Sequence, residues 1–497
     1  MSKIRVTYSG LIALIVGLVS VITGIAFTLI VTRQLTADEF GTWTLIGGLL
    51  TYVIITESTI SFWTTREIAR GNESGRTALF ASGVFSTVGI AIYIVIAYLV
   101  ALQQSLDIEV LLLGAILVPL FFVDRTLTAI SYGWKPQVVS YGILAVELAK
   151  IPAGLILVYI FDLGLVGAIV ATAIAYFVSI LIQIIYVREK LRSAISFQSI
   201  KKWIKLSVIP LYPGISNFLH KLDVLIFSVV TGSVTGLAYY AAANTISSLV
   251  SQTGGLSRAI YPKLLESDER EYFKENLTRL FYFAVPFSAI SITFMKPAIF
   301  ALNPIYEIAA PVVIFLTGKM FLANLSSVFY QSLIGIEKID VNENSNWKDY
   351  VKSKLFVIPT LFIIQGIIFI VSLIVGIVIL LGLNTAELDL VIYWSICIFV
   401  VQVPFTIYLY KLVKKNFKSI LDFKAVIKYV LATFGIFIPI YFLTENSLQY
   451  KISIFEFLPE LMIYVVIGIV SYLGLTYLID AKTRILFKAI LNELIKK

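Results

Sequence analysis

The sequence predicts an all-α, polytopic membrane protein, and two observations carry this prediction. The chain has 497 residues, of which 59% are hydrophobic and only 14% charged, with a mean hydropathy of +0.93. A soluble protein of this length needs a far more polar surface. Uncharged runs also recur along the whole chain, beginning with the 27 residues from Val6 to Thr32. Since a spanning helix needs roughly 20 apolar residues, most of the surface is predicted to face lipid.

Fourteen spanning helices are expected. The first is too long and apolar for a secretory signal, and no small-residue cleavage site follows it, so it is predicted to stay in the membrane. The spans are predicted near residues 11–33, 41–63, 78–102, 108–131, 137–161, 163–187, 206–230, 234–256, 279–301, 306–335, 354–382, 388–411, 424–444 and 455–480.

The connection between the first two spans, "VTRQLTADEFGTW" (31–43), interrupts two apolar runs with charges. Asp38 and Glu39 are suited to the amino end of the second span, where the helix dipole is positive. Arg33 is a candidate for a part in gating at this turn. The segment is therefore predicted to be a tight outer turn.

Basic residues indicate how the chain is oriented. With the amino terminus inside, 32 of the 39 Lys and Arg residues lie on the inner side and only Arg33, Lys296 and Lys451 on the outer side. This asymmetry follows the positive-inside rule and places both termini in the cytoplasm. The net charge of +9 is then a topological signal that requires no nucleic acid partner.

An internal repeat divides the chain. Gly236, in "SVVTGSVTGLAYY", corresponds to Gly41 at an offset of 195, and each glycine precedes an aromatic residue near the start of a span. Two such turns six spans apart predict two six-helix halves, 1–205 and 206–412. Residues 413–497 add two further helices and a basic tail that is predicted to lie along the inner headgroups.

Several segments resemble the polysaccharide biosynthesis proteins, the Wzx-type flippases of the multidrug/oligosaccharidyl-lipid/polysaccharide exporter superfamily. The similar segments are "RQLTADEFGTWTL" (33–45), "LGLVGAIVATAIAY" (163–176), "IKLSVIPLYPGISNFLHKLDVLIFSVVTGSVTGLAYYAAA" (204–243) and "YEIAAPVVIFL" (306–316). The resemblance implies a flippase that moves a polyprenyl-linked oligosaccharide across the membrane by alternating access. It implies that the two halves are six-helix bundles around a central cavity. It also implies that spans 13 and 14 form a groove for the lipid tail, as in the related lipid II flippases.

Ionisable residues within the spans are the candidate site. Such residues cost at least ~2.5–3.5 kcal/mol at mid-membrane and usually face a cavity or a partner. The cationic candidates for binding a pyrophosphate are Lys221, Lys319, Lys150 and Arg125. Lysine binds phosphate as a point charge and arginine can bind it through two hydrogen bonds.

Internal pairing is the alternative for some of these charges. Glu147 lies three residues before Lys150, and His220 three before Asp223, so each pair shares a helical face. For Asp124 and Arg125, pairing across helices near the inner end of span 4 is expected. His220 and Asp223 remain candidates for the site, His220 for a proton-linked role. Glu57 is a further charge in the inner half of span 2.

Span 7 carries two prolines in its first turns, Pro210 and Pro213. A proline inside a helix removes a backbone hydrogen bond and kinks the helix. The prolines are therefore gating candidates, with a static kink as the alternative.

The sequence argues against an enzyme. The outer loops are short, the inner loops carry no phosphate-binding glycine-rich motif, and His220 is the only histidine. No cofactor or metal is expected, and the coupling ion, Na⁺ or H⁺, is left open. The expected partners are a lipid-linked oligosaccharide, membrane lipids and glycan-assembly glycosyltransferases. A multidrug or small-cation antiporter is the alternative function, and a membrane glycosyltransferase or polymerase is a weaker one.

Overall fold

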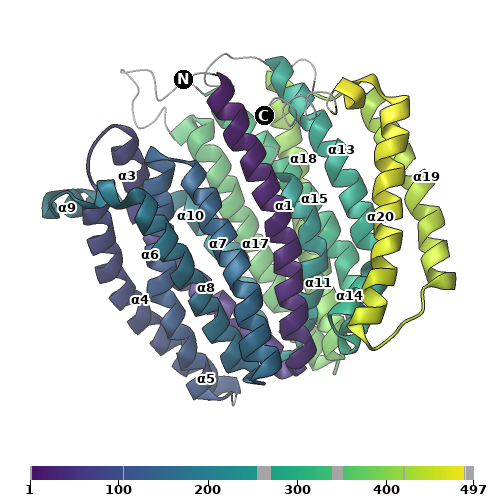
Figure 1. Ribbon diagram of the computed structural model, residues 1–497, viewed down its shortest axis with the longest axis horizontal. Helices are drawn as coiled ribbons and strands as arrows, with labels where there is room; N and C mark the ends of the chain where they lie inside the picture. Colours follow the sequence, from purple (N-terminus) through teal and green to yellow (C-terminus); the bar gives the residue numbers. More distant parts are fainter. Residues whose placement is uncertain are drawn as a thin grey trace. The chain divides into compact units, whose positions relative to one another are not determined.

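The computed structural model describes residues 3–104, 106–254, 270–337, 351–417, 420–485 and 487 (Figure 1). Within these ranges the regular structure is helical, and no strand is found. The all-α class predicted from the sequence is confirmed. Below, "outer" and "inner" denote the two ends of the helices as predicted from the sequence.

The helices are roughly consistent with the predicted number of spans. Among the described residues, eleven helices are long and apolar enough to cross a membrane, and a pair bent by 67° makes a twelfth. The other two predicted spans correspond to α1 (Lys3–Gln34) and to α11 (Thr235–Ser251), which has 17 residues. Each of the fourteen predicted spans overlaps a helix, and the chain is a multi-pass membrane protein.

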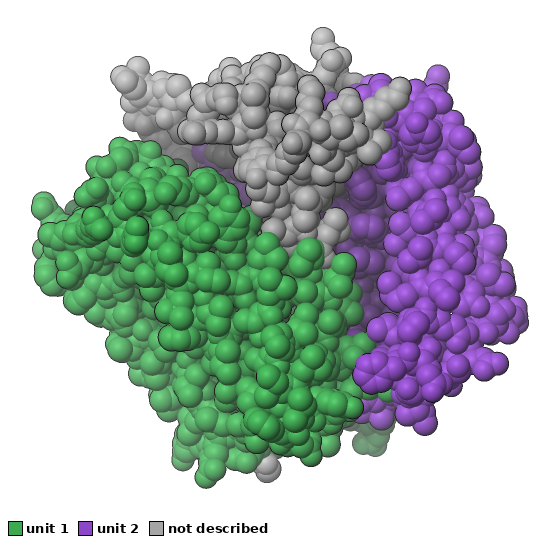
Figure 2. Space-filling model, in the orientation of Figure 1, with its two compact units in different colours: residues 1–241, 362–393 green, residues 242–361, 394–497 purple. Residues whose placement is uncertain are grey.

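Contacts divide the chain into two compact units, coloured separately in Figure 2. Unit 1 comprises Met1–Ala241 and Phe362–Tyr393, and unit 2 comprises Ala242–Leu361 and Trp394–Lys497. The predicted division into 1–205, 206–412 and 413–497 follows the sequence repeat and stays a prediction.

Unit 1 holds the helices of the amino-terminal half together with parts of the second half. They are α1, α2 (Ala37–Ile54), α3 (Ser58–Ala69), α4 (Gly75–Gln104), α5 (Ile108–Leu113), α6 (Leu117–Trp134), α7 (Gln137–Gly154), α8 (Gly164–Val187), α9 (Phe197–Lys205), α10 (Val208–Thr231), the start of α11, most of α17 (Lys354–Gly382) and the start of α18 (Glu387–Asn416). A 3₁₀ turn, Ile55–Glu57, joins α2 to α3, and a π-helix, Leu155–Ile160, extends α7.

Small residues let the helices of unit 1 approach closely. The main packing pairs are α7 with α8, α3 with α6, and α1 with α7. A Cβ at Gly142 of α7 would lie 2.9 Å from the Gln183 side chain of α8, so a larger residue would push these helices apart. α10 packs on α2.

Unit 2 holds the remaining helices. They are the end of α11, α13 (Arg270–Thr293), α14 (Met295–Leu302), α15 (Ala310–Gly335), the start of α17, most of α18, α19 (Phe423–Ser447) and α20 (Ile454–Ile479). The predicted span 279–301 is the bent pair α13–α14. Pro297 explains the break, because it has no N–H to donate to the carbonyl of Thr293, the last residue of α13.

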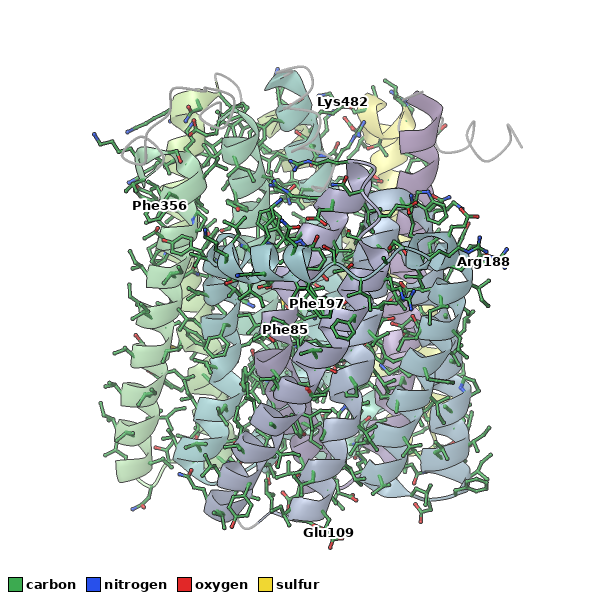
Figure 3. The ribbon with its side chains drawn as sticks, turned by 90° about the vertical axis from the view of Figure 1, so that its left-hand side faces the viewer. Phe85, Glu109, Arg188, Phe197, Phe356 and Lys482 are labelled. Atoms are coloured by element: carbon green, nitrogen blue, oxygen red, sulfur yellow. The ribbon has the colours of Figure 1, made fainter. Side chains whose placement is uncertain are left out.

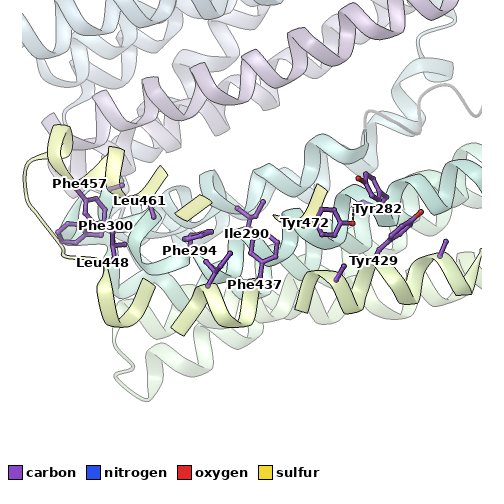
Figure 4. Close-up of a cluster of buried hydrophobic side chains, with 14 residues drawn as sticks. Tyr282, Ile290, Phe294, Phe300, Tyr429, Phe437, Leu448, Phe457, Leu461 and Tyr472 are labelled. Carbon is purple, nitrogen blue, oxygen red and sulfur yellow. Dashed lines mark hydrogen bonds between the residues drawn. The ribbon is translucent and has the colours of Figure 1, made fainter. Parts of the chain in front are cut away.

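An aromatic cluster joins α19 and α20 to α13 and α14 (Figure 4). Tyr282, Tyr429 and Tyr472 gather at one end, where the Tyr472 hydroxyl donates to the Tyr282 carbonyl at 2.8 Å. Phe300 and Phe457 contact each other at the other end, with ring centroids 5.1 Å apart. The two carboxy-terminal spans are therefore packed on unit 2 along most of their length.

Candidate functional site

The turn between α1 and α2 caps the amino terminus of α2 with side-chain hydrogen bonds. The Thr36 hydroxyl accepts from the Glu39 N–H at 3.2 Å, and the Glu39 carboxylate accepts from the Thr36 N–H at 2.9 Å. This capping box satisfies two backbone N–H groups that a helix start leaves without partners. The expected position of Asp38 and Glu39 at the amino end of the second span is confirmed.

The two glycine turns paired by the sequence repeat contact each other. A Cβ at Gly41 would lie 1.9 Å from the carbonyl oxygen of Val234, so only glycine fits here without a backbone shift. The Thr235 hydroxyl donates to the Asp38 carboxylate at 2.5 Å beside this contact. The start of α2 is thereby fixed against the turn that precedes α11.

A third helix completes this arrangement through Glu387, the first residue of α18. Its carboxylate accepts from the Gly236 N–H at 2.7 Å and from the Ser233 hydroxyl at 2.5 Å. Sequence reasoning missed Glu387, although an acidic residue at the start of a span on the outer side was the available signal. We call these residues the turn cluster: Asp38, Gly41, Ser233, Val234, Thr235, Gly236 and Glu387.

The predicted site residues of α10 lie in contrasting environments. Asp223 is 4% exposed, whereas the Lys221 side chain is exposed and forms no ion pair with any residue that the structure describes. Tyr52 of α2 fixes this stretch: its hydroxyl donates to the Lys221 carbonyl at 2.6 Å and accepts the Leu225 N–H at 3.3 Å. The Lys221 side chain is thus exposed, while the backbone around it is held by the two hydrogen bonds of Tyr52.

His220 lies against α17. Its ring stacks on Phe369 with centroids 6.2 Å apart, and its Nδ1 is 2.8 Å from the Ser216 carbonyl oxygen. A Cβ at Gly366 would lie 2.8 Å from the Leu219 side chain, so α17 approaches α10 closely here. These contacts place His220 at the junction of α10 and α17.

Lys150 and Glu147 of α7 do not form the ion pair that their spacing allowed. The Glu147 carboxylate accepts from the hydroxyls of Ser20 and Thr23 of α1, at 2.8 and 2.9 Å. The Lys150 ammonium lies over the Phe27 ring of α1, 4.3 Å from its centroid. Both side chains therefore join α7 to α1 through separate contacts.

Asp124 is satisfied by neutral donors of α8. Its carboxylate accepts from the Ser179 hydroxyl and the Gln183 amide, both at 2.7 Å. The Arg125 side chain is exposed, and no ion pair between Asp124 and Arg125 is found in the described part of the chain. Asp124 therefore pairs across helices, as expected, through hydrogen bonds to neutral donors and not through an ion pair, and the pairing expected for Arg125 stays a prediction.

Glu57 is the deepest carboxylate of unit 1, at 1% exposed, and lies in the 3₁₀ turn between α2 and α3. It accepts from the hydroxyls of Ser61, at 2.5 Å, and Thr126, at 3.1 Å. The sequence indicates Glu57 only as a charge within a span and not as a site residue. The signal that marked it was its place in an otherwise apolar run.

The other candidates are placed as follows. Lys319 is half-buried on α15 of unit 2, and Arg33 is half-buried near the end of α1. Pro210 is the third residue of α10 and Pro213 the sixth, and α10 continues as one helix to Thr231. In the first turn a proline costs no hydrogen bond, so Pro210 is compatible with a regular helix start. Roles in binding and gating stay predictions.

Among the described residues, no group of three or more His, Cys, Asp or Glu side chains is arranged to hold a metal ion.

The comparisons with solved structures identify the fold. An inward-facing multidrug resistance MATE family transporter of the MOP superfamily has a TM-score of 0.60 and 12% identity, and the match covers 82% of this chain and 98% of that one. The lipid II flippase MurJ in an inward closed conformation has a TM-score of 0.63 and 16% identity, covering 94% and 98%. An outward-facing MATE family transporter has a TM-score of 0.52 and 15% identity, covering 82% and 94%.

No protein-family model and no curated protein matches the chain. At these identities the likeness concerns the fold. The chain has the fold of the MATE family transporters of the MOP superfamily and of the lipid II flippase MurJ.

Proposed function

We propose that the protein is a flippase that moves a polyprenyl-(pyro)phosphate-linked oligosaccharide across the cell membrane by alternating access. The observation that carries this proposal is the extent of the structural matches. MurJ covers 94% of the chain and the MATE transporters 82%, a difference of about 60 residues. The carboxy-terminal helices α19 and α20 have 25 and 26 residues, which is a comparable length.

The packing of these two helices also favours a lipid-linked substrate. They are fixed on α13 and α14 by the aromatic cluster, so they belong to unit 2 and are not a loose appendage. Apolar side chains such as Phe434, Ile463 and Val470 remain exposed on them. An apolar surface of this kind suits contact with acyl or polyprenyl chains.

Lys221 supports an anionic cargo. It is the fourteenth of the 24 residues of α10, and its side chain is exposed without an ion-pair partner in the described residues. An ammonium at this depth requires water or an anion, because hydrocarbon cannot solvate it. A pyrophosphate provides the matching charge.

Binding to the full-length protein tests the proposal. We expect the unmodified chain to bind a polyprenyl-pyrophosphate-linked oligosaccharide in nanodiscs and to bind the uncharged polyprenol much more weakly. Replacing Lys221 or Lys319 by Gln should weaken binding of the charged ligand tenfold or more, since a hydrogen bond to a charged group contributes roughly 1.5–3 kcal/mol. Lys296→Gln, at an exposed lysine near the outer end of unit 2, is the matched control.

Lys221→Arg keeps the charge and should retain most of the affinity. Equal binding by the unmodified chain and both Gln variants, with normal thermal stability, would refute the cationic site.

Multidrug export is the second candidate, favoured by the likeness to MATE transporters. It predicts binding of an organic cation and no binding of the lipid-linked sugar. Lys221→Gln should then strengthen binding of the cation, because it removes a like charge.

A further inference from the structure

The short helix α9 has two exposed faces of different chemistry. Phe197 is 69% exposed and Ile204 is 50% exposed, and they lie seven residues apart on one side of the helix. The adjacent side carries three exposed lysines, Lys201, Lys202 and Lys205. An apolar strip beside a basic strip is typical of a helix that lies in the plane of a membrane surface.

The third face of α9 fixes it to unit 1. Trp203 is 1% exposed in a cluster with Ile60 and Trp63 of α3, and its indole N–H donates to the Glu67 carboxylate at 3.0 Å. The exposed residues are therefore surface features of a firmly held helix.

The start of α9 is held against α4. The N–H of Ser196, the helix cap, donates to the Thr77 hydroxyl at 3.0 Å. The Phe197 ring contacts Phe80 edge to face, with centroids 5.7 Å apart. These contacts fix which side of α9 faces away from unit 1.

The position of α9 matches the level of the inner headgroups. Its hydrogen bonds reach Glu67 in the last turn of α3 and Thr77 in the first turn of α4, and the Phe197 ring contacts Phe80 in the second turn of α4, while Trp203 packs further along α3. Figures 1 and 3 show α9 running crosswise to the spanning helices, with Phe197 labelled in Figure 3. A helix in this direction at the end of a span lies parallel to the bilayer surface.

We propose that α9 is a binding surface for anionic phospholipid headgroups. Phe197 and Ile204 insert at the boundary of the acyl chains, and Lys201, Lys202 and Lys205 contact the phosphates. Charge complementarity selects anionic over zwitterionic lipid, and Arg188 and Arg192, exposed just before α9, add to the same field. This surface does not depend on the transported substrate.

A single-cysteine reporter tests the proposal in the full chain. Cys397 is the only cysteine and is buried, so Cys397→Ala with Gln198→Cys places one fluorophore on an exposed position of α9. The labelled protein is reconstituted in phosphatidylcholine nanodiscs that contain spin-labelled phosphatidylglycerol or, at the same fraction, spin-labelled phosphatidylcholine. We expect stronger quenching by the anionic lipid, and the ratio of the two quenching constants measures selectivity.

The triple substitution Lys201→Gln, Lys202→Gln, Lys205→Gln should lower this ratio strongly, with Arg188 and Arg192 accounting for the selectivity that remains. Each lysine near a membrane surface contributes about fivefold, so a loss of tenfold or more is expected. The matched control is Lys411→Gln, Lys414→Gln, Lys415→Gln at the end of α18, which removes the same charge from exposed lysines of unit 2 and should leave the ratio unchanged.

Two further measurements keep the proposal falsifiable if the triple variant does not fold. In the labelled protein with its three lysines intact, raising the ionic strength should lower the selectivity, because salt screens exposed charges. Replacing the three lysines by Arg should preserve it. Equal quenching by the two lipids would overturn the proposal. Quenching by aqueous iodide and by neither lipid would also overturn it, and would indicate that this surface faces water or a soluble partner.

Discussion

The contact between Gly41 and Val234 gives a sharp prediction about the turn cluster. Gly41→Ala adds a Cβ that would lie 1.9 Å from the Val234 carbonyl oxygen and 2.6 Å from its carbon. An ordinary contact needs about 3.5 Å, so one backbone must move by about 1.5 Å. The same carbonyl accepts the Leu237 N–H at 3.0 Å at the start of α11, and this bond is strained by any shift.

Gly47→Ala is the matched control, because it lies on the same helix and its Cβ would meet nothing within 4 Å. Both substitutions gain up to ~1 kcal/mol of helix propensity. The difference between them therefore isolates the overpacking term, which is typically about 1–3 kcal/mol. If the turn cluster can open, its open form should become about five- to 150-fold more populated in Gly41→Ala.

Cysteine labelling measures this population. In a Cys397→Ala background, Val234→Cys places a thiol at a position that is 5% exposed. We expect a membrane-impermeant maleimide applied from the outer side to react slowly with the parent and at least fivefold faster with Gly41→Ala. Equal labelling rates and equal thermal stabilities for the Gly41 and Gly47 variants would refute the close contact.

Three further predictions concern burial, pH and topology. Glu57→Ala should destabilise the protein by about 1–3 kcal/mol in thermal unfolding, since it leaves the buried Thr126 hydroxyl without its acceptor, whereas Glu57→Gln should be milder. The hydrogen bond from Lys482 lowers the pKa of Asp422, with burial opposing it, so this contribution to stability is present above the ordinary carboxyl pKa and lost as the pH falls through the lowered one. Lys482→Met should remove that acid-dependent loss in a thermal-stability series below about pH 4. A reporter inserted near Asn446 should be external, and one fused after the last residue cytoplasmic.

Each of these has a clear contrary outcome. The exposed Glu109 is the control for Glu57, and equal stability of both Ala variants would show that the buried hydrogen bonds contribute little. An unchanged acid profile in Lys482→Met would assign the loss of stability to other carboxylates. A carboxy-terminal reporter on the outside would contradict the fourteen-span count. A reporter inserted near Ser345, which lies outside the described residues, is also expected to be cytoplasmic.

Two features of the fold were missed in the sequence, the bend between α13 and α14 and the short helix α9. The bend at Phe294 was missed although Pro297 could have indicated it, because an apolar run shows how long a segment is and not whether it stays straight. α9 was also missed, since nine residues are too few for a span and its basic residues were read only as part of an inner loop.

The sequence by itself determined the all-α class and where most of the long apolar helices begin and end. The predicted span 354–382 coincides with α17, Lys354–Gly382, and the start of α2 follows from the local hydrogen bonds of Thr36 and Glu39. A span can be predicted from the sequence because the bilayer thickness sets the length of its apolar run. A helix cap can be predicted because it involves residues only three positions apart.

Only the tertiary structure decided which partner each charged or polar group meets. Spacing on one helix suggested that Glu147 pairs with Lys150, but the carboxylate accepts from Ser20 and Thr23, more than 120 residues away in the chain. The repeat paired Gly41 with Gly236 as equivalents, yet gave no sign that Gly41 touches the turn before α11. Helical periodicity shows which face of a helix is polar, whereas the neighbour that face meets depends on how distant helices pack.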